Sequence, residues 1–339
     1  MECPRLEATA PARADCPRLE VTAPVRADRP PTLVFITSDA HHGHPSTTPG
    51  CPSSPGGVTG PIGPAGRDPL PLAGRTVLVT GVSRRIGIGH AIACRAADYG
   101  ASIVAHHYRP HDTSQPWGAD DIDAVMDSIR THLVGPARLI DLPADLAAPG
   151  EPACVVEQAV AAVGHLDALV CNQAMSSPDG SLSEMTEAVL DAHWAVDARA
   201  SILLAQAFAA QEGFAASAPA GSVRRRGAIV FLTSDQGLGP LPGEIAYAAA
   251  KAAIAGLTPT ISEELIDAGI TVNTVNPGPV DTGYVTEADR EAIAAMFPQG
   301  RWGEPDDAAR LITWLLTDEA RWITGQVINS EGGFARWRR

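Results

Sequence analysis

The sequence has few cysteines, few aromatic residues and no long apolar run. Six cysteines lie at positions 3, 16, 51, 94, 154 and 171 with no close pair, which argues against a disulfide framework or a zinc site. A reducing compartment suits such a chain, so we expect a cytoplasmic protein. No apolar run approaches the roughly 18–20 residues that span a bilayer, and the start lacks the apolar core of a secretory signal.

Cationic residues are also scarce. Lysine and arginine number 25 against 39 aspartates and glutamates, a formal net charge of −14. An acidic chain is repelled by nucleic acid and by anionic membrane surfaces, so we expect neither as a partner. A small-molecule substrate remains the expected partner.

Proline is unevenly distributed. Residues 1–74 hold 14 of the 29 prolines, and a thirteen-residue unit occurs twice, from Cys3 and from Cys16. Such a composition buries too little apolar surface to offset the loss of chain entropy. We therefore predict a disordered Pro-rich extension over 1–72 and one folded domain over 73–339, and we interpret His41, His42 and His44 as a solvated cluster rather than a metal site.

The folded part begins with a strand, a glycine-rich loop and a helix. Thr76-Val-Leu-Val-Thr80 reads as a buried strand, the loop runs from Gly81 to Gly89, and an Ala-rich helix follows from His90. Glycines let backbone N–H groups approach a pyrophosphate, and the helix N-terminus favours its negative charge. This arrangement predicts a nucleotide-binding site.

A second constellation follows the apolar run Gly227–Thr233. Ser234 ends that predicted strand, and Tyr247 and Lys251 lie four residues apart on an Ala-rich helix, so they share one face. A nearby ammonium favours the phenolate of a tyrosine, and a serine hydroxyl can hold a substrate oxygen beside it. The three residues can pass a proton to or from a carbonyl or alcohol oxygen.

Together these motifs resemble the short-chain dehydrogenase/reductase family, in particular its 3-oxoacyl-carrier-protein reductase type, over about residues 75–334. The resemblance implies a single α/β domain with a doubly wound parallel sheet of about seven strands, a Rossmann fold. It also implies an NAD(P) cofactor and a homotetramer or homodimer. The loop between Gly81 and Gly87 is two residues longer than the family's pattern.

The resemblance assigns catalytic roles. Tyr247 is the expected general acid/base, Lys251 lowers its pKa and holds the cofactor ribose, and Ser234 positions the substrate oxygen. Asp197 stands where the family has an asparagine that links the lysine to solvent, and both a tolerated exchange and an altered proton relay remain open. An ionised Asp197 should raise the pKa of Tyr247, so Asp197→Asn should move the basic limb of the pH–rate profile downward.

The resemblance also implies the cofactor site and no metal site. Its expected residues are Gly81, Ser83, Arg84, Arg85, Gly87, Ile88, Gly89, His107, Arg109, Asp145, Leu146, Asn172, Tyr247, Lys251, Pro277, Gly278 and Thr282. His107 stands where NAD-dependent enzymes of this fold place an acid for the ribose diol. With arginines flanking the position, we predict NADP in preference to NAD.

The expected function is NAD(P)-dependent interconversion of a ketone, 3-oxoacyl-like or another carbonyl, and a secondary alcohol. Gln173, Ala174 and Asp197 depart from the family's pattern, which leaves open a catalytically impaired NAD(P)-binding sensor or scaffold. An epimerase or dehydratase using the same Tyr/Lys pair is a further alternative. Residues 283–300 are expected to form a mobile substrate lid.

Overall fold

The computed structural model describes residues 68–215, 227–284 and 287–335. The compact unit begins at Asp68 rather than at residue 73. Leu72 is fully buried, and its N–H donates to the Tyr99 carbonyl at 2.9 Å, so the chain packs against the domain before the first strand. The rest of the predicted extension, with its histidine cluster, lies outside the described residues.

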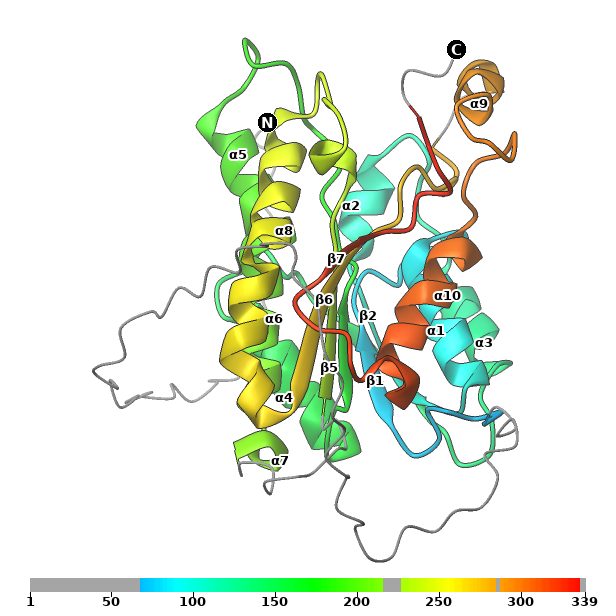
Figure 1. The fold of residues 1–339 in the computed structure, drawn as a ribbon, viewed down its shortest axis with the longest axis vertical. Helices are drawn as coiled ribbons and strands as arrows, with labels where there is room; N and C mark the ends of the chain where they lie inside the picture. Colours follow the sequence, from blue (N-terminus) through cyan, green and yellow to red (C-terminus); the bar gives the residue numbers. More distant parts are fainter. Residues whose placement is uncertain (1–67, 216–226, 285–286, 336–339) are drawn as a thin grey trace, which may run out of the picture. The chain divides into compact units, whose positions relative to one another are not determined.

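Seven parallel strands form one sheet in the order β3-β2-β1-β4-β5-β6-β7, which confirms the predicted doubly wound fold (Figure 1). The strands are β1 Thr76–Val79, β2 Ser102–His107, β3 Leu139–Pro143, β4 Ala168–Cys171, β5 Gly227–Leu232, β6 Ile270–Asn276 and β7 Val327–Asn329. The order reverses between β1 and β4. Ligands of this fold bind beyond the carboxyl ends of the strands at such a reversal.

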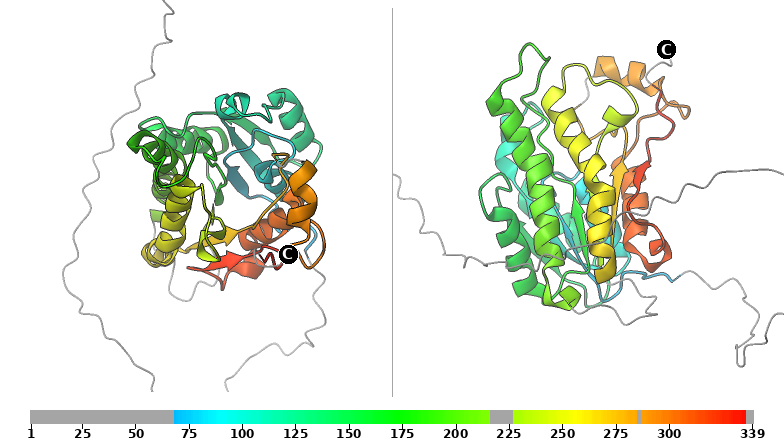
Figure 2. Two further views of the ribbon diagram at one scale, coloured as in Figure 1. Left: turned by 90° about the horizontal axis from the view of Figure 1, so that it is seen from above. Right: turned by 60° about the vertical axis from the view of Figure 1, so that its left-hand side comes forward.

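Helices cover both faces of the sheet, with α4, α6 and α8 on one side and α1, α3 and α10 on the other (Figures 1 and 2). The helices are α1 Ile88–Asp98, α2 Arg109–Ser114, α3 Ile122–Arg130, α4 Glu151–Val163, α5 Glu187–His193, α6 Ala200–Ala209, α7 Glu212–Ala215, α8 Ile245–Leu265, α9 Glu287–Ala294 and α10 Pro305–Leu316. A π-helical segment, Trp194–Arg199, joins α5 to α6. The helical chain thus runs without interruption from Glu187 to Ala209.

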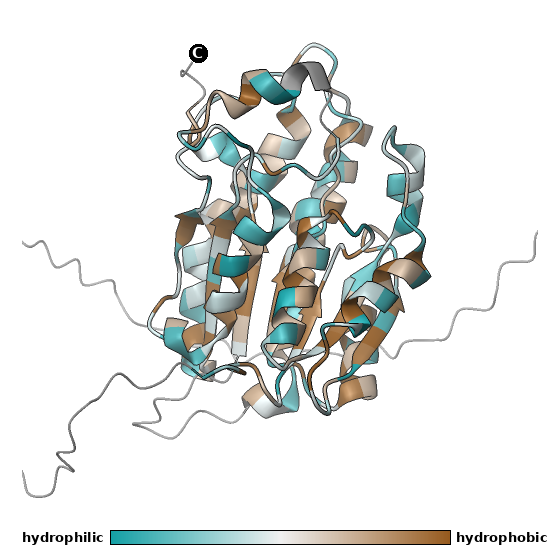
Figure 3. Ribbon diagram, turned by 90° about the vertical axis from the view of Figure 1, so that its right-hand side faces the viewer, coloured by the Kyte–Doolittle hydropathy of each residue, from teal (hydrophilic) through white to brown (hydrophobic). Residues whose placement is uncertain are grey.

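Each face of the sheet has its own apolar core. Successive side chains of a strand point to opposite faces, and accordingly Val77 and Val79 pack with α1 and α10 whereas Leu78 packs toward α4 and α6. Strands buried on both faces read as continuous apolar runs, which is why β5 could be recognised from its sequence. Figure 3 shows strands that are mostly apolar beside helices in which polar and apolar residues alternate.

Three findings bear on alternative functions. Within the described ranges, no helix has the length and apolar character needed to cross a membrane. The same residues include no group of three His, Cys, Asp or Glu side chains able to hold a metal ion. The described cysteines 94, 154 and 171 are free thiols.

Candidate active site

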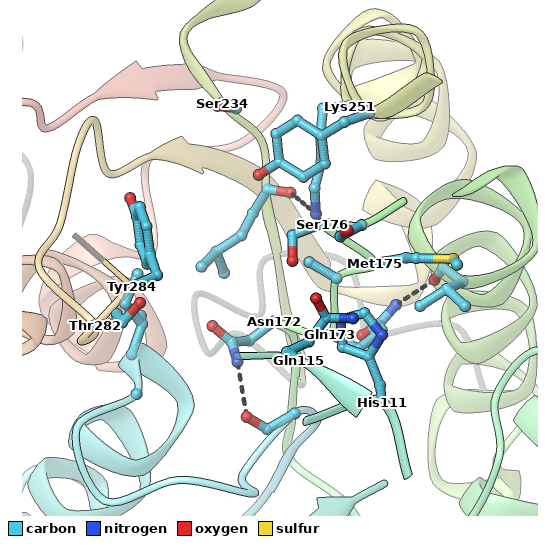
Figure 4. A pocket seen from close by; sticks show the side chains of 18 of the residues that line it. His111, Gln115, Asn172, Gln173, Met175, Ser176, Ser234, Lys251, Thr282 and Tyr284 are labelled. Carbon is cyan, nitrogen blue, oxygen red and sulfur yellow. Dashed lines mark hydrogen bonds between the residues drawn. The ribbon is translucent and has the colours of Figure 1, made fainter. Parts of the chain in front are cut away.

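A cavity of about 1200 Å³ lies beyond the carboxyl ends of the strands. In Figure 4, Ser234 and Lys251 lie on one side of it, Thr282 and Tyr284 on another, and Asn172 and Gln173 near the centre. The predicted site residues that line it are Gly81, Ser83, Arg84, Gly87, Ile88, Asp145, Leu146, Asn172, Ser234, Tyr247, Lys251, Pro277, Gly278 and Thr282. Those that do not line it are Arg85, Gly89, His107, Arg109 and Asp197.

Close backbone packing builds the glycine-rich end of the cavity. Gly81 has φ of +71°, a conformation that L side chains rarely adopt. A Cβ on Gly89 would lie 2.5 Å from the Gly81 carbonyl oxygen and 2.6 Å from Nδ2 of Asn172. Gly89 thus supports the loop from behind, while Asn172 ties it down by donating to the carbonyls of Thr80 and Gly81 at 3.0 and 3.2 Å.

The end of β2 differs from the prediction. His107 is buried and its Nε2 lies 2.8 Å from Oδ1 of Asp141 on β3, so the imidazole does not line the cavity. Because side chains alternate along a strand, His106 lines it instead, with Nε2 3.1 Å from the Ala144 carbonyl. Burial lowers the pKa of His106 to about 4, which keeps this imidazole neutral. His106, one residue before the expected His107, therefore lines the cavity.

The expected cofactor-binding residues include three arginines, at positions 84, 85 and 109. Of these, only Arg84 lines the cavity. Its Nη2 donates to the Thr282 carbonyl at 2.7 Å, and its guanidinium lies 5.6 Å from the centre of the Trp117 ring. Arg85 instead contacts Asp120 through its backbone N–H and its Nε, and Arg109 lies outside the cavity lining.

An acid that sequence reasoning missed lies at the same end. Asp112 on α2 is buried and accepts hydrogen bonds from Oγ of Ser83 at 2.5 Å and from Nε1 of Trp117 at 3.3 Å. Asp112 lies close to the glycine-rich loop because of the position of the short helix α2. The spacing of residues in the sequence does not reveal this contact.

Helix α8 presents the catalytic candidates. Lys251 is 3% exposed, its Nζ donates to the Leu232 carbonyl at 3.3 Å and lies 5.6 Å from the centre of the Tyr247 ring. Ser234, two residues beyond the end of β5, lines the same cavity as Tyr247. The predicted serine, tyrosine and lysine therefore share one site.

Burial raises the pKa of Tyr247, and the negative charge of Asp197 raises this pKa further. The interaction with the Ser234 hydroxyl lowers the pKa by less. On balance the phenol is a weaker acid than free tyrosine, contrary to the expected effect of Lys251. A phenol that stays protonated at neutral pH is a proton donor, which suits the reduction of a carbonyl.

Asp197 comes from the π-helical segment and lies behind the cavity wall. Its Oδ1 accepts from the Met175 N–H at 2.8 Å and lies 3.9 Å from Nζ of Lys251. Its Oδ2 lies 3.4 Å from Nδ1 of His193, a wholly buried residue that sequence reasoning did not single out. The pair was recognisable only as an i, i+4 spacing.

Gln173, noted above as a departure, is fully engaged. Its Oε1 accepts from Oγ1 of Thr80 at 2.5 Å, and its Nε2 donates to Oγ of Ser201 at 2.8 Å and to the Val196 carbonyl at 3.2 Å. It therefore links the end of β1 to the π-helical segment. A side chain that satisfies three partners is an integral part of this site.

Asp179 caps α8 from a separate loop. Its Oδ1 accepts from the Ala246 N–H at 3.1 Å and its Oδ2 from the Tyr247 N–H at 2.9 Å. These are first-turn N–H groups that have no partner within the helix. The loop after β4 thus fixes the backbone of the catalytic tyrosine.

Three aromatic side chains form one side of the cavity. Trp117 contacts Tyr284 edge to face with ring centres 6.4 Å apart, and Tyr284 contacts Trp302 in the same manner at 6.5 Å. Tyr284 and Trp302 flank α9, which lies within the expected lid. The segment Pro116–Gly118 carried no periodic signal that could have placed Trp117 here.

Comparisons with known proteins agree with this geometry. The family described as Enoyl-(Acyl carrier protein) reductase matches residues 81–335. An uncharacterised oxidoreductase of Bacillus subtilis is 40% identical over 266 residues, covering 77% of this chain and 97% of that protein. A 3-oxoacyl-[acyl-carrier-protein] reductase of Thermotoga maritima is 31% identical over 77% of this chain and 98% of its own length. A crystal structure of a short-chain dehydrogenase from Burkholderia cenocepacia in complex with NADP is 32% identical, with a TM-score of 0.65 over 77% of this chain and 98% of that one.

Proposed function

The chain belongs to the short-chain dehydrogenase/reductase family, and from this premise we propose that it reduces a ketone to a secondary alcohol with NADPH, Tyr247 being the proton donor. The observation that carries the proposal is the meeting of Ser234, Tyr247 and Lys251 in the cavity that the glycine-rich loop closes at its other end. One site can then hold a dinucleotide and a carbonyl together.

Lysine usage supports the role of Lys251. It is the chain's only lysine, so the other 24 of the 25 cationic residues are arginines. A guanidinium would be too long and too planar for a place that needs a compact charge under a tyrosine ring. The position of this one ε-ammonium, 5.6 Å from the centre of the Tyr247 ring, supports the proposed proton transfer.

The chain's own residues divide the work as follows. Ser234 holds the carbonyl oxygen, and Tyr247 donates its phenolic proton to that oxygen as negative charge develops on it. Lys251 stabilises the resulting phenolate electrostatically. The bound nicotinamide supplies the hydride. Gly81, Gly87 and the N-terminus of α1 are the groups that would hold the pyrophosphate.

The choice of NADP over NAD rests on three observations. No acid ends β2, Arg84 lines the cavity, and a relative of the same fold binds NADP. Asp112 is a carboxylate that lines the cavity, and it accepts hydrogen bonds from Ser83 and Trp117. Comparing kcat/KM for NADPH and NADH tests the choice, and a preference for NADH would refute it.

Turnover itself is tested by following NADPH consumption across a panel of 3-oxoacyl, polyketide-like and small cyclic ketones. We expect saturable consumption with at least one class. Binding of NADPH without consumption of any ketone would favour the sensor alternative, and product formation without net NADPH loss would favour an epimerase or dehydratase. The three hydrogen bonds of Gln173, and the bond that Oδ1 of Asp197 accepts from the Met175 N–H, weigh against an impaired site.

Two coarser expectations accompany this proposal. A cytoplasmic location follows from the cysteine usage of the chain. A homodimer or homotetramer follows from the family resemblance, and light scattering of the purified protein would measure the assembly.

A further inference from the structure

His193 faces two hydrogen-bond acceptors. Its Nε2 lies 2.9 Å from the Pro178 carbonyl, and a carbonyl oxygen can only accept, so Nε2 carries a proton. Its Nδ1 lies 3.4 Å from Oδ2 of Asp197, and an ionised carboxylate also only accepts. The arrangement is favourable when a second proton lies between these two atoms.

Neither atom has an alternative partner. Nδ1 of His193 and Oδ2 of Asp197 are both buried, and neither makes a hydrogen bond with any other group that the structure describes. Leaving a buried carboxylate oxygen without a hydrogen bond is costly. One shared proton makes the pair neutral overall, whether it resides on the imidazole or on the carboxyl group.

The charge of this pair matters because of what surrounds it. Lys251, on α8, lies 3.9 Å from Asp197, and the Tyr247 ring lies 6.3 Å from the His193 ring. Asp179, the other acid facing His193, accepts from the first turn of α8. Burial lowers the pKa of His193, but Asp197 and the bond to Pro178 outweigh burial and raise it on balance.

We propose that His193 is a positioning residue for the ketone reduction proposed above: it shares one proton with Asp197 and so leaves Lys251 as the unopposed charge beside Tyr247. This proposal rests on the proposed function for its role in turnover. It also revises the expectation for Asp197→Asn. Losing the carboxylate releases the proton from His193 as well, so the net charge near Tyr247 hardly changes.

A double-mutant cycle tests the proposal through the pH–rate profile. In His193→Gln the amide can still donate to the Pro178 carbonyl but cannot neutralise Asp197. The pKa of Tyr247 should rise, and the basic limb of ketone reduction should move up by about one pH unit. Asp197→Asn and the double variant should both lie near wild type. No shift in His193→Gln, or the same shift when Asp197 is also changed, would overturn the proposal.

His132→Gln is the matched control. His132 lies 2.9 Å from Asp98 in a partly exposed pair that does not line the cavity, so its loss should leave the profile unchanged. The same variant shows how much thermal stability is lost when a His–Asp pair outside the cavity is removed. Thermal unfolding of each variant shows whether the fold is retained.

A measurement without turnover separates this proposal from the proposed function. In the full-length protein, ¹⁵N NMR follows the protonation of His193, identified by its absence from His193→Gln. The midpoint should lie higher in wild type than in Asp197→Asn. Equal midpoints would overturn the sharing of a proton, even if a ketone substrate is found. A higher midpoint without any turnover would leave the pair intact and refute only the reaction. If His193→Gln fails to fold, the comparison with Asp197→Asn still decides.

Discussion

At the scale of single residues, the site depends on which groups keep their protons. Tyr247 is held protonated chiefly by burial, and the Ser234 hydroxyl moderates this effect. A phenol that keeps its proton can donate it, which is the role proposed for Tyr247 in ketone reduction. The buried His193–Asp197 pair behind it determines how strongly Lys251 acts on that phenol.

Tyr247→Phe should lower kcat for ketone reduction by about 10²–10⁴-fold while leaving the Kd for NADPH nearly unchanged, because it removes the proton donor and little volume. Steady-state kinetics and fluorescence titration measure the two quantities. Tyr99→Phe, which changes a tyrosine next to the buried N-terminal core, is the control and should leave kcat unaffected. Substantial residual turnover in Tyr247→Phe would mean that another group donates the proton.

His193 should also give stability a pH dependence. Its folded pKa is raised above the unfolded value, so its contribution is fully present below the unfolded pKa of about 6.5 and is lost as pH rises through the folded pKa. The difference in Tm between wild type and His193→Gln should accordingly be largest near pH 6 and shrink toward pH 9. A difference that grows with pH would contradict the sign of this shift.

At the scale of elements, the loop after β4 organises the catalytic half. Met175 donates to the π-helical segment, Pro178 accepts from His193, and Asp179 caps α8. Five consecutive residues of this loop therefore connect the continuous helix of α5 and the π-helical segment to α8, which is distant in sequence. π-helical turns are frequent at functional sites, and this one carries Asp197.

Asp179→Ala should reduce the free energy of unfolding by about 1–2 kcal/mol, the usual effect of losing an N-terminal cap, and should lower kcat as well, because the freed backbone carries Tyr247. Chemical denaturation and kinetics measure both. Asp191→Ala on the exposed side of α5 is the control. If Asp179→Ala lost no more stability than Asp191→Ala, the cap would contribute nothing.

The features that could be predicted from the sequence are those encoded by neighbouring residues. They are the apolar runs of β1 and β5 and the strand–loop–helix that carries Ser234, Tyr247 and Lys251. The Asp179 cap and the orientation of His107 depend on tertiary packing, which no spacing reveals. Side chains alternate between the two faces of β2, so a prediction that is one residue out selects His107, although His106 is the residue that lines the cavity.

At the scale of the whole molecule, the folded domain includes residues that precede the first strand. Leu72 is fully buried within the core that includes α1 and α10, although it precedes β1. The compact unit starts at Asp68. Residues 68–72 thus belong to the folded domain.

Two truncations should therefore differ. Removal of residues 1–67 should leave Tm and NADPH affinity unchanged, whereas removal of residues 1–72 should cost about 1.5–3 kcal/mol, the value of fully burying a leucine side chain. Differential scanning calorimetry measures the Tm of the two truncated proteins, and fluorescence titration measures their affinity for NADPH. Equal Tm values for the two truncations would mean that Leu72 is not needed, and a large loss from the shorter truncation would show that the extension stabilises the domain.

The burial of Lys251 has a practical consequence. Because the chain has no other lysine, acylating and crosslinking reagents have a single ε-amine to attack, and it is 3% exposed and hydrogen-bonded to β5. A reagent too large to enter the cavity that Lys251 lines can reach it only in molecules whose α8 has separated from the sheet. The amount of ε-acylated peptide that such a reagent produces therefore counts molecules that have opened, without any engineered label.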